Sequence, residues 1–465
     1  MKDLIVKDII KVTNAKLIIG SEEETLENFA RDTRVIKQND TYIAIKGEKF
    51  DGNIFWKEAL ENGAKAVIVQ DVDFKKEDLS KYDGKIILEV EDTLKALHKM
   101  AEYKRSLYDI PVIGITGSVG KTSTKDIIAS VVSQKYKTLK TEGNNNNNIG
   151  LPFTILRLKD HEAAVIEMGM NHQGEISLLT KIAKPTISVI TNIGTSHIGN
   201  LGSKENILKA KLEILEGMEK PLLVLNNDND LLHDYYEKNN KVEIKTYGIS
   251  NLSDIMAKNI NKEEIGSSFE CILNGNNTKI NVPVGGEHFV LNALCACEVG
   301  ELLGIENDKI VAGIKKFELT NKRMDISVLS NGVTIINDSY NASYESMTAA
   351  LKYLSNLKNT RKIAILGDMY ELGNFTEELH KKVGEEVVKN KIDLLICTGK
   401  FAKFIYDSAI KNNTKEAYYF EEKEDAFSFL NSNLQNGDSV LVKASNGMRF
   451  FDMIDKYLLY NKKMV

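Results

Sequence analysis

Residues 113–123 read Ile113-Gly114-Ile115-Thr116-Gly117-Ser118-Val119-Gly120-Lys121-Thr122-Ser123. An apolar run leads into this glycine-rich turn, and apolar residues at helical spacing follow it. A strand, a glycine loop and a helix that opens on Lys121 and Thr122 form a cradle for phosphate. The glycines let backbone N–H groups face the phosphates, Lys121 reaches the terminal ones, and the Thr122 hydroxyl suits Mg²⁺. The segment therefore predicts a phosphate-binding loop.

The glycine spacing of this loop differs from the Walker A pattern. That pattern has glycine five positions before Gly120, where this chain has Ile115, and the preceding glycines are Gly114 and Gly117. The alternative is a glycine-rich turn between a strand and a helix that binds no ligand. Because Gly120, Lys121 and Thr122 come directly after a buried strand, we favour the phosphate loop.

The bulk properties of the chain predict a multidomain globular protein. A chain of 465 residues is too long for a single hydrophobic core, and this length suggests about three domains. With 61 basic and 66 acidic residues, the net charge of −5 gives no basic surface for nucleic acid. No apolar run approaches the roughly 20 residues of a membrane span, and charges interrupt the apolar residues at the N-terminus. We therefore expect a cytoplasmic protein, with no need for more than a monomer.

The four cysteines do not have the spacing of a zinc site or of a disulfide framework. None forms a CxxC pair, and we expect reduced, buried thiols. They are Cys271, Cys295, Cys297 and Cys397.

Short apolar runs alternate with helical segments along most of the chain, which predicts an α/β protein of three domains. Residues 1–90 form a small N-terminal α/β domain. Residues 91–320 form a central phosphate-loop domain with a mostly parallel sheet, because its apolar runs are continuous. Residues 249–284 alternate more and predict antiparallel strands. Residues 321–465 repeat the pattern of a doubly wound, Rossmann-like domain.

Two polar side chains follow successive strands of the central domain. Glu167 closes one apolar run, and His197 lies just beyond the run at residues 187–190. Ligands of parallel sheets bind at the carboxyl ends of strands, so Glu167, His197 and Thr122 are candidate partners of Mg²⁺. Either residue alone is more often structural. Farther along, Lys209 is typical of a solvated helix face, whereas the sequence leaves the role of Lys211 open.

Residues 144–148 are a run of five asparagines that is either a disordered loop or a binding loop. An ordered element follows at once, and side-chain amides suit a polar substrate. In the last domain, polar groups end three strands at residues 337–341, 367–369 and 443–447. A solvated rim would look similar, but the three together favour a site.

With these motifs the chain resembles the Mur ligases, the ATP-dependent amide-bond-forming enzymes of peptidoglycan precursor synthesis. The glycine spacing of the phosphate loop is the one typical of this family. Residues 143–150, 167–176 and 366–373 resemble the subgroup that adds D-alanyl-D-alanine to UDP-N-acetylmuramoyl-tripeptide. Residues 32–34 and 46–52 resemble the segments that hold the UDP-sugar end. The resemblance covers the chain from end to end.

The resemblance implies a ligase that forms an acyl phosphate with ATP and yields UDP-N-acetylmuramoyl-pentapeptide, ADP and phosphate. The N-terminal domain would bind the UDP-sugar, and the C-terminal domain would bind the dipeptide and close over ATP. Catalytic residues would be Lys121, Glu167, His197, Lys211 and Arg323. ATP would contact Thr116, Gly117, Ser118, Val119, Gly120, Lys121, Thr122, Ser123, Asn292, Arg323 and Asp338. Substrates would contact Thr33, Arg34, Lys46, Gly47, Asp51, Asn144, Asn147, His172, Asn341, Lys443 and Ser445.

The resemblance further implies two Mg²⁺ ions, held by Thr122, Glu167, His197 and Lys211, with Lys211 as a carbamate. Asn292 would contact adenine, Arg323 phosphate and Asp338 ribose. His172 either orients the substrate or is structural. One position departs from the subgroup, which usually has His-Asn where this chain has His288 and Phe289.

Other members of the family and a non-catalytic nucleotide switch are the competing hypotheses. The diaminopimelate-adding ligase usually carries Asp-Asn-Pro-Arg, which is absent here. Folylpolyglutamate synthase lacks a UDP-sugar domain of the kind that residues 1–90 suggest. A switch would need the phosphate loop but not Glu167, His197 and Lys211.

Overall fold

The computed structural model describes residues 3–47, 50–262, 266–319, 323–358 and 360–458. By its internal contacts the chain divides into two compact units. Unit 1 comprises Met1–Ile115, Tyr136–Ser188 and Leu212–Leu222, and unit 2 comprises Thr116–Lys135, Val189–Lys211 and Leu223–Val465. Glu48 and Lys49 of the predicted UDP-sugar segment, and the predicted domain boundary between residues 320 and 321, lie outside the described residues.

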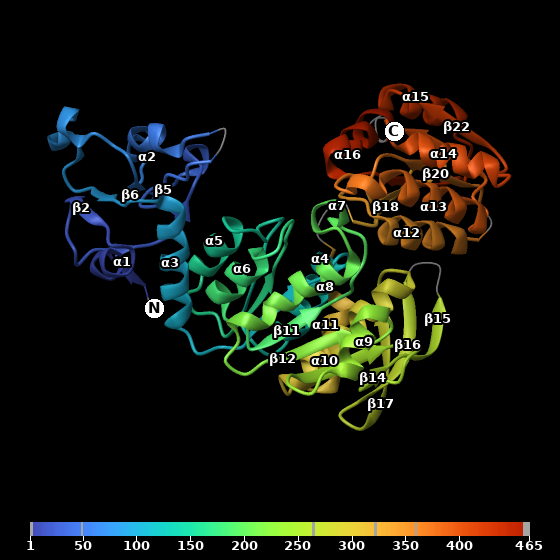
Figure 1. The fold of residues 1–465 in the computed structure, drawn as a ribbon, viewed down its shortest axis with the longest axis horizontal. Helices are drawn as coiled ribbons and strands as arrows, with labels where there is room; N and C mark the ends of the chain where they lie inside the picture. Colours follow the sequence, from blue (N-terminus) through green and yellow to red (C-terminus); the bar gives the residue numbers. More distant parts are fainter. Residues whose placement is uncertain (1–2, 48–49, 263–265, 320–322, 359, 459–465) are drawn as a thin grey trace. The chain divides into compact units, whose positions relative to one another are not determined.

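The N-terminal domain is a five-stranded sheet with helices packed on it (Figure 1). Its strand order is β2 (Lys16–Ile19), β7 (Ile86–Glu89), β6 (Ala66–Val69), β5 (Thr41–Ile43) and β4 (Phe29–Ala30). Neighbours are parallel except at β2–β7. Beside it lie β1 (Leu4–Ile5), β3 (Thr25–Leu26), α1 (Val6–Thr13), α2 (Trp56–Glu61) and α3 (Thr93–Ser106). The buried Trp56 anchors the core of this domain.

The central domain contains a seven-stranded sheet with the phosphate loop in its middle. The order is β14 (Ile255–Met256), β13 (Glu243–Gly248), β12 (Leu222–Asn226), β11 (Ile187–Ile190), β8 (Val112–Thr116), β10 (Ala163–Glu167) and β9 (Thr138–Lys140). Its helices are α4 (Lys121–Val132), α5 (Gly150–Leu156), α6 (Glu175–Ala183), α7 (Ile198–Leu201), α8 (Lys204–Leu212), α9 (Asp230–Lys238), α10 (Glu287–Leu302) and α11 (Asn307–Lys316).

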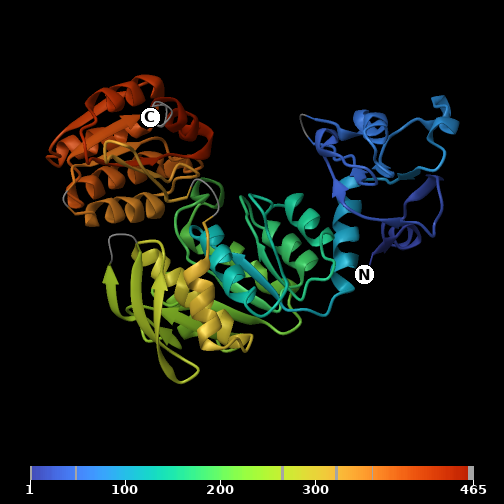
Figure 2. The same cartoon turned by 180° about the vertical axis from the view of Figure 1, so that it is seen from behind.

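The antiparallel strands predicted within residues 249–284 are confirmed in part. β15 (Lys258–Lys262), β16 (Ser267–Leu273) and β17 (Asn276–Val282) form a small antiparallel sheet of their own, yellow in Figure 2. β14 instead pairs in parallel with β13 and extends the main sheet. Helix α10 begins at Glu287, directly after Gly286, whose φ of 120° lies outside the helical region.

The C-terminal domain has the doubly wound architecture that the sequence predicts. Its strand order is β18 (Asp325–Val328), β19 (Thr334–Asn337), β23 (Ser439–Lys443), β20 (Lys362–Leu366), β21 (Leu394–Thr398) and β22 (Ala417–Phe420). Helices α12 (Tyr344–Asn356) and α13 (Thr376–Lys389) lie on one face, and α15 (Lys423–Asn433) and α16 (Phe450–Met453) on the other (Figure 1). Helix α14 (Ala402–Lys411) packs on α13 and β21. The antiparallel edge strand β18 was not predicted, because its four residues form no continuous apolar run.

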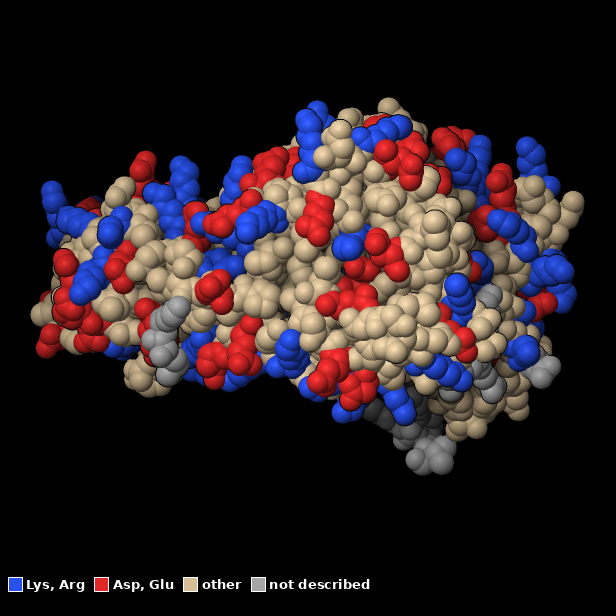
Figure 3. Space-filling view, turned by 90° about the horizontal axis from the view of Figure 1, so that it is seen from below, with Lys and Arg blue, Asp and Glu red and all other residues tan. Residues whose placement is uncertain are grey.

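All four cysteines are buried and unbridged, as expected. Among the described residues, no helix combines the length and apolar character needed to cross a bilayer. On the face in Figure 3, Lys and Arg side chains are interspersed with Asp and Glu, in keeping with the balanced composition.

A buried histidine fastens residues 366–373 to helix α13. His380 Nε2 accepts from the Met369 N–H at 3.0 Å, and Nδ1 lies 2.6 Å from the Thr376 carbonyl. The first contact makes Nε2 the acceptor, so the proton is on Nδ1 and donates to Thr376. Burial lowers the pKa of His380 to about 4, so the folded protein keeps this imidazole neutral.

We expect His380 to make the C-terminal domain less stable in acid. The unfolded imidazole titrates near 6.5, so between pH 6.5 and about 4 the unfolded chain binds a proton that the folded chain does not. The free energy of opening should fall through this window by about 3 kcal/mol and stay level above it. Hydrogen exchange in peptides covering residues 366–389 measures this. In His380→Gln, which keeps an acceptor for Met369, the pH dependence should largely vanish. An equal slope in both proteins would contradict the assignment.

Candidate active site

The phosphate loop joins β8 to α4 as the sequence predicts. Gly117 and Gly120 have φ of 155° and 80°, and Gly120 is the N-cap of α4. The Lys121 ammonium donates to the Gly117 carbonyl at 2.7 Å and lies 3.4 Å from the Ser118 carbonyl. Lys121 is thus held over the glycine turn, at the N-terminus of a helix where anions bind favourably.

A second loop, which follows β11, supports the phosphate loop. Asn192 accepts from the Ser118 N–H through its carbonyl and from the Val119 N–H through its side chain, both at 3.0 Å. Thr191 Oγ1 donates to the Val119 carbonyl at 2.7 Å, and the Gly194 N–H donates to Ser118 Oγ at 2.9 Å. Asn192 was missed, although the strand-end rule that selected His197 would also have selected it.

Gly117 has no room for a side chain, so we expect Gly117→Ala to weaken nucleotide binding. An added Cβ would lie 1.9 Å from Thr191 Oγ1 and 3.1 Å from Thr191 Cβ. Strain of about 1–3 kcal/mol corresponds to about 5- to 150-fold in the dissociation constant, which calorimetric titration with ATP measures. Adding Thr191→Ala removes the nearest atom and should restore part of the affinity, with Thr191→Ala alone as the control. Unchanged binding in Gly117→Ala would show that the loop relaxes freely.

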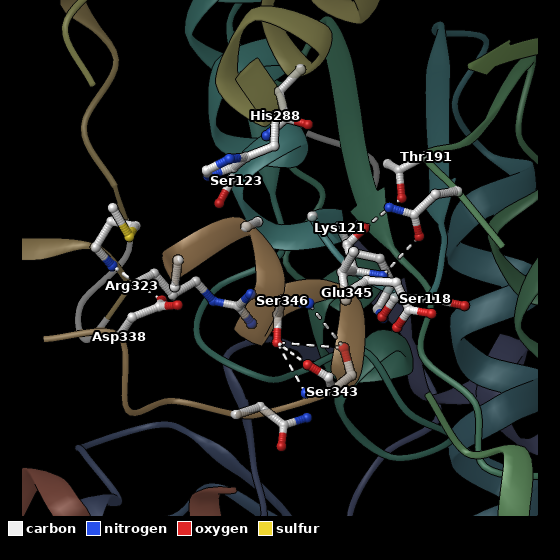
Figure 4. Close-up of a pocket in the computed structure, with 18 of the residues that line it drawn as sticks. Ser118, Lys121, Ser123, Thr191, His288, Arg323, Asp338, Ser343, Glu345 and Ser346 are labelled. Atoms are coloured by element: carbon white, nitrogen blue, oxygen red, sulfur yellow. Dashed lines mark hydrogen bonds between the residues drawn. The ribbon is translucent and has the colours of Figure 1, made fainter. Parts of the chain in front are cut away.

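Within unit 2, the phosphate loop borders a cavity of about 170 Å³. Figure 4 shows Arg323 and Asp338 on one side of this cavity and Ser118, Lys121 and Glu345 on the other. The predicted residues that line it are Ser118, Val119, Gly120, Lys121, Ser123, Asn292, Arg323, Asp338, Asn341 and Lys443. Residues from segments more than 300 positions apart therefore meet at one site.

Asn292 and His288 lie in the N-terminal half of α10 and line this cavity. Asn292 is 7% exposed, and its Nδ2 is buried without a hydrogen-bond partner among the described residues. Burial lowers the pKa of His288 to about 4, which keeps it neutral. Phe289 is buried, with its ring 4.4 Å from that of His288 and 6.5 Å from that of Phe317. Phe289, the residue that departs from the subgroup pattern, is therefore part of the hydrophobic core.

Lys443 and Asp338 form a buried ion pair at the rim of the C-terminal sheet. The Lys443 ammonium, 2% exposed, lies 2.5 Å from Asp338 Oδ2 and also donates to the carbonyls of Asp338 and Asn341. Asp338 Oδ1 accepts from the Met324 N–H at 3.2 Å. The Arg323 guanidinium lies over the Tyr340 ring at 4.3 Å. These contacts fix the orientation of the Asp338 carboxylate.

The three polar strand ends predicted in the C-terminal domain do share one rim. They follow β19, β23 and β20, which are parallel neighbours in the sheet. Asn446 donates to the Tyr340 carbonyl at 3.0 Å, and the buried Ser445 accepts from the Tyr370 N–H at 2.9 Å. Asp368 accepts from the N–H groups of residues 401 and 402 and so caps α14.

Two other predicted residues of unit 2 lie on the segment that leads to α8. His197 adopts a left-handed backbone with φ of 63°, and its Nδ1 lies 2.5 Å from Glu371 Oε2. Lys211, in the last turn of α8, is 1% exposed, whereas Lys209 on the same helix is exposed. Burial, and then the charge of Lys121, hold the pKa of Lys211 well below its usual range. Lys211 therefore does not lie on a solvated helix face, and its role stays a prediction.

The asparagine run in unit 1 is an ordered loop. Asn146 Nδ2 donates to Glu167 Oε1 at 2.8 Å, and the Asn146 carbonyl accepts from the Gly169 N–H. Asn147 Oδ1 accepts from the N–H groups of Ile149 and Gly150, at the start of α5. Glu167 itself is 2% exposed. Sequence reasoning singled out Asn144 and Asn147 but missed Asn146, the member that touches Glu167. Identical neighbours in the run gave no signal to choose it.

The predicted UDP-sugar segments converge on Tyr42 in unit 1. The Tyr42 hydroxyl donates to the Gly52 carbonyl at 2.9 Å, and burial and the charges of Asp32, Glu58 and Asp51 raise its pKa to about 12. The remaining predicted side chains have local partners: Thr33 donates to Glu58, Arg34 pairs with Asp32, Lys46 pairs with Asp71, and Asp51 accepts from Asn53. Gly47 donates to the Phe50 carbonyl. His172 is exposed, with Nδ1 3.5 Å from Glu175.

Comparison with known proteins agrees with this geometry. Residues 28–105, 115–300 and 322–446 match models of the "Mur ligase family, catalytic domain", the "Mur ligase middle domain" and the "Mur ligase, glutamate ligase domain". The UDP-N-acetylmuramoyl-tripeptide–D-alanyl-D-alanine ligase of Bacillus subtilis is 37% identical over 454 residues, which is 97% of each chain.

Solved structures agree as well. The crystal structure of MurF from Acinetobacter baumannii is 28% identical with a TM-score of 0.88, covering 98% of this chain and 99% of that one. The MurF ligase of Thermotoga maritima in complex with ADP is 27% identical with a TM-score of 0.81, covering 94% and 99%. From these matches over almost its whole length, the chain belongs to the Mur ligase family.

Proposed function

We infer that the chain is an ATP-dependent ligase that joins D-alanyl-D-alanine to UDP-N-acetylmuramoyl-tripeptide in peptidoglycan precursor synthesis. The observation that carries this function is the match over 97% of both chains to a relative that bears this name. The cavity beside the phosphate loop supplies the phosphate-binding groups that such a reaction needs.

The reaction must activate a carboxylate, because a carboxylate is a poor acyl donor. A carboxylate oxygen of the tripeptide attacks the γ-phosphorus of ATP, ADP leaves, and an acyl phosphate forms. The amine of D-alanyl-D-alanine then attacks the acyl carbon, loses a proton, and expels inorganic phosphate. Lys121 and Arg323 neutralise the charge on the phosphates, and the protein positions the reactants.

For the nucleotide, we propose that Thr116 to Ser123 hold the phosphates, Asn292 the adenine and Asp338 the ribose. The unpartnered, buried amide of Asn292 fits a hydrogen bond to a base edge. Lys443 and the Met324 N–H orient the Asp338 carboxylate, which suits a ribose hydroxyl. Arg323, stacked on Tyr340, is the cation for the phosphates on the C-terminal side.

For the metal, we propose that Thr122, Glu167, His197 and a carbamylated Lys211 hold two Mg²⁺ ions. A hydroxyl, a carboxylate and a carbamate are hard oxygen donors that fit Mg²⁺, and the buried Glu167 has one oxygen already fixed by Asn146. Bound Mg²⁺ supplies charge neutralisation at the phosphate oxygens. Thr122, His197 and Lys211 belong to unit 2 and Glu167 to unit 1. The proposal that these four residues act together therefore rests on the family motifs.

For the substrates, we propose that the UDP-sugar end contacts Thr33, Arg34, Lys46, Gly47 and Asp51. The peptide would contact Asn144, Asn147 and His172, and the incoming dipeptide Asn341, Lys443 and Ser445. Because the reaction consumes ATP, we place it in the cytoplasm, with the chain acting as a monomer. The predicted domain boundaries after residues 90 and 320 remain part of this proposal.

Phosphate release from ATP tests the function directly. The purified protein is supplied with Mg²⁺, UDP-N-acetylmuramoyl-tripeptide and D-alanyl-D-alanine, and each is omitted in turn. We expect release that depends on both substrates and a pentapeptide product by mass spectrometry. Release without the dipeptide would indicate a sibling ligase or an uncoupled ATPase. Tight ATP binding without release would favour a nucleotide switch.

A further inference from the structure

We propose that Glu345 and Glu371 clamp residues 194–199 against the phosphate loop and are positioning residues for the ligation. Both glutamates lie in the stretch that matches the glutamate ligase domain, whereas residues 194–199 lie in the stretch that matches the middle domain. The clamp would thus couple docking of the C-terminal domain to the geometry of the phosphate site. The reaction that it serves is the proposed function, but the contacts themselves do not depend on that reaction.

Glu345 forms the first half of the clamp. Its Oε1 accepts from the Thr195 N–H at 2.8 Å, and its Oε2 accepts from Thr195 Oγ1 at 2.9 Å. A Cβ on Gly194 would lie 2.6 Å from Glu345 Cδ, so only glycine allows the carboxylate to approach the backbone this closely. Hydrogen bonds to a carboxylate are stronger than neutral ones, and Thr195 is 3% exposed.

Glu371 forms the second half. Its carboxylate lies 2.5 Å from His197 Nδ1, and its carbonyl accepts from the Gly199 N–H at 3.0 Å. A Cβ on Gly199 would lie 2.6 Å from the Gly373 nitrogen, so here too the two segments meet backbone to backbone. The carboxylate thus lies directly beside the His197 imidazole and restricts where that ring can lie.

The two partners in the second contact both have strained backbones. His197 and Glu371 each have φ of 63°, in the left-handed region that side chains with a Cβ rarely adopt. Such conformations persist only where surrounding contacts impose them, and they gather at functional sites. Two left-handed residues in contact across two domains therefore indicate that this contact has a functional role.

The clamped segment is also bonded to the phosphate loop. The Gly194 N–H donates to Ser118 Oγ at 2.9 Å, and Ser196 Oγ donates to the Ser118 carbonyl at 3.2 Å. Ser118, Ser196 and Glu345 all line the nucleotide cavity, where Figure 4 shows Ser118 and Glu345 side by side. A shift of residues 194–199 would therefore also move the phosphate loop that these hydrogen bonds hold in place. By linkage, a nucleotide that orders this loop should favour docking of the C-terminal domain to the same extent.

The distance between the two domains tests the clamp independently of catalysis. Spin labels at Lys238→Cys on α9 and Lys389→Cys on α13 use exposed positions, and the four native cysteines are buried. We expect a narrow distance distribution by pulsed electron spin resonance in the parent with ATP. It should broaden in Glu345→Ala and in Glu371→Ala. Glu345→Gln keeps an acceptor for the Thr195 N–H and should broaden less. Glu378→Ala, which removes an exposed carboxylate that pairs with Lys382 on the same helix, should match the parent.

Kinetics give a second reading of the same variants. We expect Glu371→Ala to weaken Mg²⁺-dependent phosphate release by about 10- to 100-fold, as loss of a partner behind a metal-binding histidine does. Unchanged distance distributions in both alanine variants, or equal broadening in Glu378→Ala, would overturn the clamp. If the chain releases no phosphate with any substrate, the proposed function fails, whereas the distances still decide the clamp. Circular dichroism of Glu345→Gln and Glu371→Gln guards against loss of the fold.

Discussion

Lys121→Ala is expected to lower the turnover of ATP by about 100- to 1,000-fold while the protein stays folded. Lys121 is the first residue of α4. Its ammonium contacts the Gly117 and Ser118 carbonyls, which hold it over the glycine turn. In the proposed reaction, the same ammonium would compensate the charge that develops as the γ-phosphoryl group leaves ADP. A preorganised cation at that position acts in the transition state and is not replaced by water at equal strength.

Two measurements separate loss of chemistry from loss of structure. Phosphate release with both substrates reports turnover, and thermal unfolding reports whether the loop still folds. Lys204→Ala, at an exposed position on α8, is the matched control and should behave as the parent. Near-normal turnover in Lys121→Ala would remove the phosphate loop from the mechanism.

Elements with a local signal were predictable from the sequence. The apolar run at residues 187–190 is the strand β11 without change, because a strand buried on both faces needs a continuous apolar run. Helix α4 likewise follows from the glycine turn and the apolar residues behind it. The carboxyl-end rule placed Asp338 and Lys443 at one rim because both end strands of the same parallel sheet.

The residues that were missed act through distant parts of the chain. Glu345 lies in the first turn of α12, where an acidic residue is ordinary, and only the fold brings it to Thr195, 150 positions earlier. Asn146 is one of five identical neighbours, and its contact with Glu167 depends on how the loop turns. Neither hydrophobic periodicity nor motif spacing predicts such contacts, since they follow from packing between separate elements.

Lys211→Ala should lower turnover by about 100-fold or more, with partial recovery when a short-chain carboxylate such as acetate is added. Lys211 is 1% exposed in the last turn of α8, and burial, followed by the charge of Lys121, lowers its pKa well below the usual range. A lower pKa means a larger neutral fraction at neutral pH. Only the neutral amine attacks CO₂, forming an N–C bond and releasing a proton to leave a carbamate anion.

Carbamylation would convert this buried amine beside Lys121 into an anion, which the Lys121 ammonium attracts. Acetate could replace that anion in the space left by Lys211→Ala but has no role in the parent, so rescue should be specific to the variant. Carbon-13 NMR with labelled bicarbonate should show a carbamate signal in the parent that Lys211→Ala lacks. Lys209→Ala, on the exposed side of the same helix, should keep both the signal and the activity. Full activity in Lys211→Ala would contradict the carbamate and would mean that this buried side chain contributes to packing alone.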